Sequence, residues 1–345
     1  MTERENHLRC IEFRRPKWIP VVVYFLPAAL HRHRERLEDL ILRHPVIFGP
    51  YRRGSIDFDS FGPAYAEGFY VDNWGCTWQN IQPGMEGQPV GHPLADYSLL
   101  DSYRPPDPLT QAERGPRPDW EQVAAQVEKA RQEGKLVWGH GDRFFERLHF
   151  LRGFSALMID FVECPPELNR LIEMVLQYNL TLVHKWLTLR PDIMSFGDDL
   201  GTQNAAMVSP ETFRRHLKPA YARMFRPCRE AGVHVRLHSD GCILELVDDL
   251  IDAGVTVLNP QVRANTLEGL RRTCKGRVCI HLDLDRQLFP FATPKQIREH
   301  VEEAVEVLAS PEGGLALYAE IGPDVPLENI EAVCSALEWA RERFS

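Results

Sequence analysis

Short hydrophobic runs alternate with longer segments of helical period along most of the chain. Eight of these runs are rich in Val, Ile, Leu and Phe and predict buried strands, at residues 20–25, 46–49, 136–139, 193–197, 233–238, 255–259, 277–282 and 314–318. Nearly continuous apolar strands that alternate with helices are typical of a parallel sheet covered on both faces. Eight such units predict a closed (β/α)8 barrel (TIM barrel), with an open, doubly wound sheet as the alternative.

Helical segments follow almost every predicted strand. They extend through about residue 185 after the third strand and then cover 209 onward, 243–253, 266–274, 294–309 and 326–343. Pro210 lies in the first turn of one segment, where its missing N–H is tolerated, and Gly254 follows the end of another. These start and stop signals support the alternation of strand and helix.

A long stretch at about residues 50–118 interrupts this alternation. It is rich in Gly, Pro and aromatic residues and includes Trp74 and Trp78, which we expect to be core residues of the stretch. Loops of this length are uncommon in compact domains unless they serve a site or form a small subdomain. We therefore predict one barrel domain over residues 1–345 with an irregular insertion at about 50–118.

The composition excludes several classes of protein. The formal net charge of -9 and the lack of a long basic block argue against a nucleic-acid partner. The chain opens on polar residues and no apolar run approaches the ~20 residues that span a bilayer, so we expect a cytoplasmic protein without a membrane partner. The 8 cysteines form no C-x-x-C pair, and no glycine-rich phosphate loop follows a strand. A small-molecule substrate is the expected partner, and a homodimer is left open.

Polar, chemically capable residues follow strand after strand. In a barrel all these strand ends converge on one face, where such enzymes place catalysis. Any single carboxylate there can simply cap the next helix, but so many together need a ligand, a metal or charged partners. The residues expected at this face are His140, Arg143, Asp198, Asp199, His238, Asp240, Asn259, Gln261, Asp283, Asp285, Arg286, Tyr318 and Glu320.

His238 and Asp240 carry the sharpest local signal. Residues two apart at a strand end point to the same side, so this pair can aim an imidazole and a carboxylate at one metal ion or one substrate atom. With Glu320 or Asp198 added, the mixed histidine and carboxylate set suits zinc or another divalent ion. His234 and His281 lie within strands, where buried, hydrogen-bonded histidines are the simpler interpretation.

The second half of the chain carries a family pattern. Its elements are His238-Ser239-Asp240-Gly241, residues 250–255, Leu258-Asn259-Pro260-Gln261, Thr293-Pro294, Gly313-Gly314 and residues 323–330, with residues 72–78, 92–96 and 105–107 in the first half. Over about residues 20–342 the chain resembles the uroporphyrinogen-decarboxylase-like superfamily. That group includes the haem-pathway decarboxylase and cobalamin-linked methyltransferases, which move methyl groups from corrinoid proteins to coenzyme M or tetrahydrofolate. The resemblance implies a barrel enzyme with its site at the carboxyl ends of the strands.

Two departures from the family pattern change what the resemblance implies. The arginine-bearing segment that grips porphyrinogen propionates is replaced by Tyr24-Phe25-Leu26-Pro27-Ala28-Ala29, so we expect no activity on porphyrinogens. In the zinc-dependent methyltransferases a His-x-Cys falls where His238-Ser239-Asp240 stands, and a later Cys falls near Ala319. Here Asp240 replaces the first thiolate and Glu320 is the nearest candidate for the second. The resemblance then implies a harder, more oxygen-rich metal site.

The leading hypothesis is a corrinoid-dependent methyltransferase, which moves a methyl group between a corrinoid protein or a methylated compound and a small acceptor. His238, Asp240 and Glu320 would hold zinc or another divalent metal, or position the acceptor. Asp283 or Asp285 would act as a base, with Tyr318 as a hydrogen-bond donor to the reacting atom. Asp198 and Asp199 complete the predicted catalytic set.

The alternative is a decarboxylase or lyase that acts on a small carboxylic acid. Arg143 or Arg286 would bind the substrate carboxylate, and Asp199 would stabilise the reacting centre. His140, Asn259 and Gln261 are predicted to bind substrate in either case. A non-catalytic binding protein is a third class, which gains little from so many closely spaced carboxylates.

Overall fold

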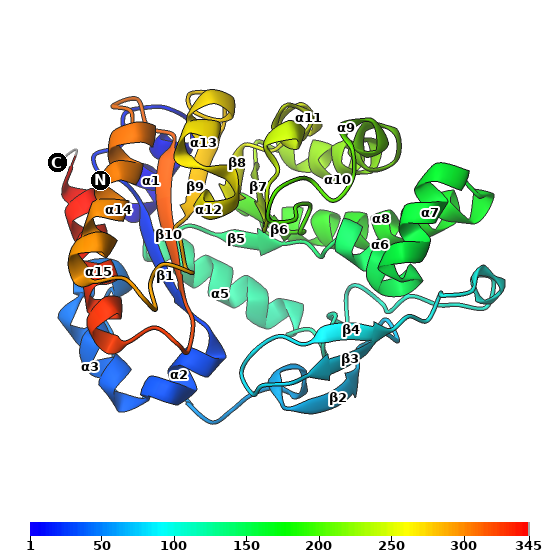
Figure 1. Ribbon diagram of the computed structural model, residues 1–345, viewed down its shortest axis with the longest axis horizontal. Coiled ribbons are helices and arrows are strands. Elements are labelled where there is room, and N and C mark those ends of the chain that lie inside the picture. The colour runs from blue at the N-terminus through cyan, green and yellow to red at the C-terminus, as the bar shows by residue number, and fades with distance from the viewer. Residues whose placement is uncertain (344–345) are drawn as a thin grey trace.

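A curled, seven-stranded parallel sheet forms the centre of the molecule (Figure 1). The computed structural model describes residues 1–343, and the order of the strands is β1-β10-β9-β8-β7-β6-β5. The strands are β1 (Val21–Phe25), β5 (Trp138–His140), β6 (Ile193–Gly197), β7 (His234–Ser239), β8 (Val257–Pro260), β9 (Cys279–Asp283) and β10 (Leu315–Ile321). Seven of the eight predicted strands are therefore present, and the prediction of a parallel α/β sheet is confirmed.

The prediction of a closed barrel is wrong for the residues that the structure describes. β1 and β5 are the two edges of the sheet and do not pair with each other, so the sheet is a half-barrel with an open seam. The predicted strand at 46–49 is instead the short helix α4 (Pro45–Phe48). Pro45 occupies its first position and Gly49 ends it at φ 67°, and an apolar run of four residues has no periodicity that separates strand from helix.

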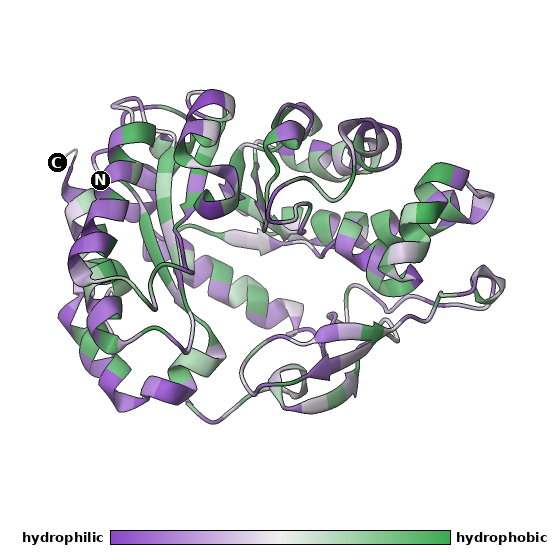
Figure 2. Ribbon diagram, viewed as in Figure 1, coloured by the Kyte–Doolittle hydropathy of each residue, from purple (hydrophilic) through white to green (hydrophobic). Residues whose placement is uncertain are grey.

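Helices cover the outer face of the sheet. Each strand from β6 to β10 is followed by at least one helix, as the sequence predicts. The helices are α1 (Glu3–Ile11), α2 (Pro27–His33), α3 (Glu35–Arg43), α5 (Trp120–Gln132), α6 (Phe145–Arg152), α7 (Phe154–Glu163), α8 (Pro166–Leu187), α9 (Pro210–Thr212), α10 (Lys218–Glu230), α11 (Val247–Ala253), α12 (Val262–Asn265), α13 (Leu267–Thr273), α14 (Pro294–Leu308) and α15 (Leu327–Glu342), with the single turns η1 (Pro63–Tyr65), η2 (Tyr97–Leu99), η3 (Phe213–Leu217) and η4 (Leu244–Leu246). Figure 2 shows hydrophobic residues along β1, β9 and β10 and a mixture of both kinds on the helices around them. Among the described residues, no helix combines the length and the apolar character needed to cross a bilayer.

The amino-terminal helix α1 closes one end of the half-barrel. Cys10 and Ile11 pack against Ile193, Val257 and Cys279, which are the first residues of β6, β8 and β9. The Cys10 thiol also donates to the carbonyl of the first residue of β10 at 3.1 Å. Helix α1 therefore covers the amino-terminal end of the sheet.

The inside of the half-barrel is polar. Along β7, Val235 and Leu237 are fully buried beneath the helices, whereas the residues between them face the inside. One of these, Arg236, donates to Ser195 Oγ at 3.0 Å and to His281 Nδ1 at 3.2 Å, and it also hydrogen-bonds Asn259. Barrels of this kind usually fill their interior with branched aliphatic side chains. Here a network of buried, hydrogen-bonded polar side chains fills part of the interior.

The predicted irregular insertion contains a small antiparallel sheet, β2 (Gly68–Val71), β3 (Thr77–Asn80) and β4 (Gln88–Gly91), in the order β2-β3-β4. Asp72 organises its core by accepting from the Cys76 N–H at 2.8 Å and from the Trp78 Nε1–H at 2.9 Å. Trp74 and Trp78 are each 1% exposed, which confirms that they are core residues. The sequence alone left open a loop or a subdomain, and the stretch forms a subdomain that lies below the sheet in Figure 1.

Candidate active site

A cavity of about 550 Å³ opens at the carboxyl end of the sheet, and the insertion contributes to its walls. Seven residues that the sequence predicts as functional line it: Arg143, Asp198, Asp199, His238, Asp240, Arg286 and Glu320. Tyr24 at the end of β1 and Tyr65 and Glu86 from the insertion also line it. The convergence of strand ends therefore places residues from distant parts of the sequence around one space, which we call the mouth cavity.

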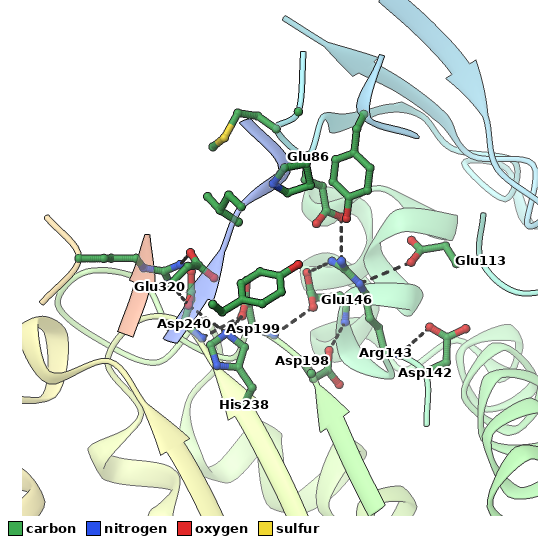
Figure 3. Close-up of a pocket in the computed structure, with 18 of the residues that line it drawn as sticks. Glu86, Glu113, Asp142, Arg143, Glu146, Asp198, Asp199, His238, Asp240 and Glu320 are labelled. Atoms are coloured by element: carbon green, nitrogen blue, oxygen red, sulfur yellow. Dashed lines mark hydrogen bonds and ion pairs between the residues drawn. The ribbon is translucent and has the colours of Figure 1, made fainter. Parts of the chain in front are cut away.

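Asp199, His238 and Asp240 form a cluster on one side of the mouth cavity (Figure 3). His238 Nε2 lies 3.1 Å from Asp240 Oδ1 and 4.0 Å from Asp199 Oδ1. One ligand atom from each residue lies within 4.8 Å of the others, which is close enough for all three to reach one cation. The Asp240 N–H donates to Asp199 Oδ1 at 2.8 Å and so holds the two loops together.

The hydrogen bond at the other ring nitrogen orients His238. His238 Nδ1 lies 2.9 Å from Asn259 Oδ1, an oxygen that also accepts from Arg236, while the Asn259 amide donates to the His281 carbonyl. The asparagine oxygen is thus an acceptor, so Nδ1 carries a hydrogen and Nε2 faces the carboxylates. Burial opposes the charge on His238, but the Asp240 hydrogen bond and the charges of Asp240 and Asp199 outweigh it and raise the His238 pKa.

Arg286 joins the remaining carboxylates of this side. Its guanidinium lies 2.5 Å from Asp240 and 3.6 Å from Asp283, and it pairs with Glu320. Glu320, which the sequence suggests as a metal ligand, pairs with Arg286, and the cluster whose ligand atoms lie within 4.8 Å of one another includes Asp199 instead. Asp283 lies beneath, 1% exposed, and burial raises its pKa to about 7.

Asp198 differs sharply from its neighbour Asp199. It is 2% exposed, and its two oxygens accept from the backbone N–H groups of Phe144, Phe145 and Glu146 and from the Tyr221 hydroxyl. Burial raises its pKa to about 6, although these donors oppose the shift. Asp198 thus holds the amino-terminal end of α6, and both of its oxygens are used in these hydrogen bonds.

Arg143 forms a second charged group on the opposite side of the mouth cavity (Figure 3). It pairs with Glu86 at 2.7 Å, with Glu146 at 2.8 Å and with Glu113 at 3.7 Å. Burial raises the pKa of Glu146 to about 8, against the attraction of Arg143. Sequence reasoning missed these three glutamates. The spacing of Glu146, three residues after Arg143, was a usable signal, whereas Glu86 and Glu113 lie in the insertion, where no periodicity marks them.

Six residues predicted at the site lie outside the mouth cavity. Asp283 and Asn259 are buried behind it, Tyr318 lies edge-on to His281 at 5.5 Å, and Asp285 pairs with Arg263 at 2.9 Å. Gln261 accepts from the Gly241 N–H at 2.9 Å and supports the loop that carries Asp240. His140 lines a second cavity. His281 is 4% exposed, in agreement with its interpretation as a buried histidine.

The mouth cavity is strongly acidic. Its lining includes eight carboxylates and two arginines, and both arginines are paired with protein carboxylates. Such a surface attracts cations and repels polyanions. It can hold a divalent ion or a small neutral or cationic substrate.

The fold is an α/β half-barrel, and its candidate site lies at the carboxyl ends of the parallel strands, where barrel enzymes place catalysis. The sequence profile described as uroporphyrinogen decarboxylase (URO-D) matches residues 149–339, and the chain belongs to this family. No curated protein matches the chain.

Solved structures extend the comparison of the fold. A methyltransferase from Methanosarcina mazei superposes with a TM-score of 0.69 at 17% identity, over 98% of this chain and 99% of that chain. A D-psicose 3-epimerase from Clostridium cellulolyticum H10 superposes with a TM-score of 0.42 at 12% identity, over 71% of this chain and 86% of that chain. The first of these likenesses covers the whole fold, including the insertion.

Proposed function

We propose that the protein is a metal-dependent methyltransferase that moves a methyl group from a corrinoid carried by a partner protein, or from a methylated compound, to a small acceptor. The observation that carries this proposal is the cluster of Asp199, His238 and Asp240 in the mouth cavity. The similar structure from Methanosarcina mazei is that of a methyltransferase, which supports the class of reaction.

The residues present fit a divalent metal. The cluster offers one imidazole nitrogen and two carboxylate oxygens, a set that suits zinc or another divalent ion. Asn259 fixes the ring with Nε2 on the side of the carboxylates, where a metal would take the place of the proton that Nε2 shares with Asp240. A bound divalent ion would lower the pKa of a thiol or hydroxyl acceptor and so make it a nucleophile at neutral pH.

The other residues of the mouth cavity have distinct roles in this proposal. Arg286 keeps Asp240 and Glu320 in place and balances part of the negative charge when the metal is absent. Asp199 and Asp240, each more than a third exposed, face the cavity as the carboxylate ligands of the metal. Tyr24 and Tyr65 line the side nearer the insertion, where they can exclude water from the transferred methyl group.

Metal content separates this role of His238 from a structural one. We expect the chelator-treated protein to take up one Co²⁺ or Zn²⁺ per chain, followed by visible absorption for cobalt and by elemental analysis for zinc. His238→Ala should lose most of this metal and keep the melting temperature within a few degrees, because the side chain lies at a strand end that faces a cavity. His234→Ala, at the other end of the same strand, is the matched control and should keep the metal.

Retained metal in His238→Ala together with a large fall in melting temperature would show that the residue is structural. Methyl transfer is then assayed with free methylcobalamin and small thiols or alcohols, by the loss of the cobalt–carbon absorbance. The wild-type protein should turn over and His238→Ala should not. Metal binding without any turnover of a panel of methyl donors would contradict the assignment as a methyltransferase.

One observation favours the second candidate, a carboxy-lyase. Since its pKa is raised to about 8, Glu146 is largely neutral at pH 7 and can give a proton to the carbon from which CO2 has left. The substrate carboxylate would, however, have to compete for Arg143 or Arg286 with protein carboxylates at 2.5 to 2.8 Å. Release of CO2 from a panel of small acids, abolished by Glu146→Gln, would favour the lyase over methyl transfer.

A further inference from the structure

A second cavity, of about 390 Å³, lies at the open seam of the half-barrel. It is bounded by α5 on one side and by the edge strand β5 on the other, where a closed barrel would have another strand. Its lining is separate from that of the mouth cavity, although the two meet where His140 is followed by Gly141. We call it the seam cavity.

The free edge of β5 presents backbone N–H groups, with the carbonyls beside them, to the seam cavity. Gly141 N–H donates to the Ser195 carbonyl of β6 at 3.0 Å, and Val137 O accepts from residues at the start of β6. Successive residues of a strand direct their N–H groups to opposite sides, so the N–H groups of Trp138 and His140 point to the unpaired edge. An unpaired strand edge is a template for an added acceptor.

Three tryptophans supply the walls. Trp120 on α5, Trp138 on β5 and Trp186 on α8 all line the cavity, with Trp120 and Trp186 edge to face at 5.4 Å. Val123, Val127 and Ala130 extend the apolar surface along α5. Flat aromatic walls of this kind favour a planar ring over a flexible chain.

Two side-chain donors of the seam cavity lack an acceptor. The Arg117 Nε and the Trp186 Nε1 are buried without a hydrogen-bond partner, and the Arg117 guanidinium donates to the Tyr178 hydroxyl at 3.0 Å. No Asp or Glu is among the described residues that line the cavity, although the chain has 49 acidic and 40 basic residues in all. These donors lack an acceptor, and the positive charge of Arg117 favours an anionic one.

His140 strengthens this electrostatic picture. It lies in a T-shaped contact with Trp186 at 5.9 Å, and its pKa is lowered by burial and by the nearby positive charges of Arg236 and Arg117. Arg236 has neutral hydrogen-bond partners, namely the side chains of Ser195, Asn259 and His281. The charges of two arginines thus reach His140 at the edge of the seam cavity, and the acceptors described above for each arginine carry no full negative charge.

We propose that the seam cavity is a binding site for a small planar aromatic carboxylate, with the ring against the tryptophan walls and the carboxylate on Arg117 and the free edge of β5. A neutral apolar ligand would leave the Arg117 Nε and the Trp186 Nε1 buried without acceptors. A flexible aliphatic acid would pair with Arg117 but would not stack on the tryptophan rings. This site is independent of the metal and of methyl transfer in the mouth cavity.

Calorimetry with 2-naphthoate tests the proposal on the full chain, and quenching of tryptophan fluorescence gives a second readout. We expect saturable binding of one naphthoate per chain. The uncharged analogue 2-naphthylmethanol and the non-aromatic cyclohexanecarboxylate should each bind at least ~10-fold more weakly, because each lacks one of the two recognised features.

Two variants locate the binding in the seam cavity. Arg117→Gln should weaken naphthoate binding by ~10-fold or more through loss of a charge-assisted hydrogen bond, whereas Arg272→Gln, an exposed arginine on α13, should not change it. Ala130→Trp should fill the cavity and abolish binding, with the fold checked by circular dichroism. His238→Ala should bind naphthoate as the wild type does, which separates this site from the mouth cavity. Absence of naphthoate binding, or equal binding by wild type and Arg117→Gln, would overturn the proposal.

Discussion

Adjacent aspartates at the end of β6 show how strongly local surroundings decide the role of a residue. Asp198 accepts four hydrogen bonds from the protein and is buried, whereas Asp199 faces the mouth cavity beside His238. The sequence places both at the same strand end and cannot distinguish them. Their difference comes from α6, whose first N–H groups point at Asp198 alone.

Asp198→Asn should destabilise the protein by about 2–4 kcal/mol, because one of its oxygens is replaced by an amide that faces buried donors. Asp199→Asn should change stability by less than about 1 kcal/mol and should lower metal uptake instead. Urea unfolding and metal titration of the two variants measure both effects. Equal losses of stability would contradict the division of roles between the two residues.

His149 provides a test of pH dependence away from the mouth cavity. It packs against Phe145, Phe150 and Phe154, and burial lowers its pKa to about 3. Because the folded pKa lies below the ordinary value of about 6.5, the unfolded chain binds the proton first, so this contribution to stability is lost as the pH falls below about 6.5.

His149→Phe should therefore gain in melting temperature relative to the wild type when both are moved from pH 7 to pH 5. The comparison removes the opposite contributions of Glu146 and Asp198, whose raised pKa values are common to both proteins. Differential scanning calorimetry at the two pH values gives the answer. A difference in melting temperature that does not change with pH would show that His149 titrates normally in the folded state.

At the scale of elements, seven of the eight strands predicted from the sequence are present, as are most of the predicted helices that follow them. Long alternations with clear start and stop signals are well determined by periodicity, as the five units from β6 to β10 show. The run at 46–49 was predicted as a strand and is a helix, because four apolar residues are too few to show a period. The strands of the subdomain around Asp72 were not predicted, because each spans only four residues.

The same limit applies to the site. Residues that follow strands were predicted to meet, and seven of them line the mouth cavity, because strand ends of a parallel sheet converge. Glu86 and Glu113 reach the cavity only through the path of the insertion, which no local pattern reveals. The sequence also could not show that Glu320 pairs with Arg286 while Asp199 lies beside His238, because these contacts form only in the folded chain.

The two loops after β6 and β7 touch through glycine. Gly241 has φ +77°, and a Cβ there would lie 2.2 Å from the backbone of Gly201. Gly241→Ala should therefore displace the loop that carries Asp240, lowering both stability and metal uptake. Gly232→Ala, which also has a positive φ but has open space around it, is the matched control for backbone strain alone. Metal uptake should fall only in Gly241→Ala, and an equal effect in the two variants would argue against the contact with Gly201.

For the molecule as a whole, acidity at the mouth limits the substrates of this member of the family. Uroporphyrinogen carries eight carboxylates, and the arginines of the mouth cavity are already paired with protein carboxylates. We expect no measurable formation of coproporphyrinogen by the pure protein, assayed by chromatography of the oxidised products, because the negative lining repels a polyanion. Clear turnover that rises with salt concentration would show that repulsion only slows binding.

The pairing of β1 with β10 also bears on how the chain reaches its fold. β1 lies at residues 21–25, and its partner in the sheet is not complete until residue 321 has been made. At about 5–20 residues per second, a ribosome needs roughly 15–60 s to make the intervening chain. Throughout that time β1 has no β10 to pair with. Figure 1 shows the two ends of the chain close together, and Arg341 pairs with Glu3. A circular permutant that joins these ends and opens in the insertion would bring β1 close behind β10 in the order of synthesis, with only α15 and α1 between them. It should fold with less dependence on chaperones than the natural order.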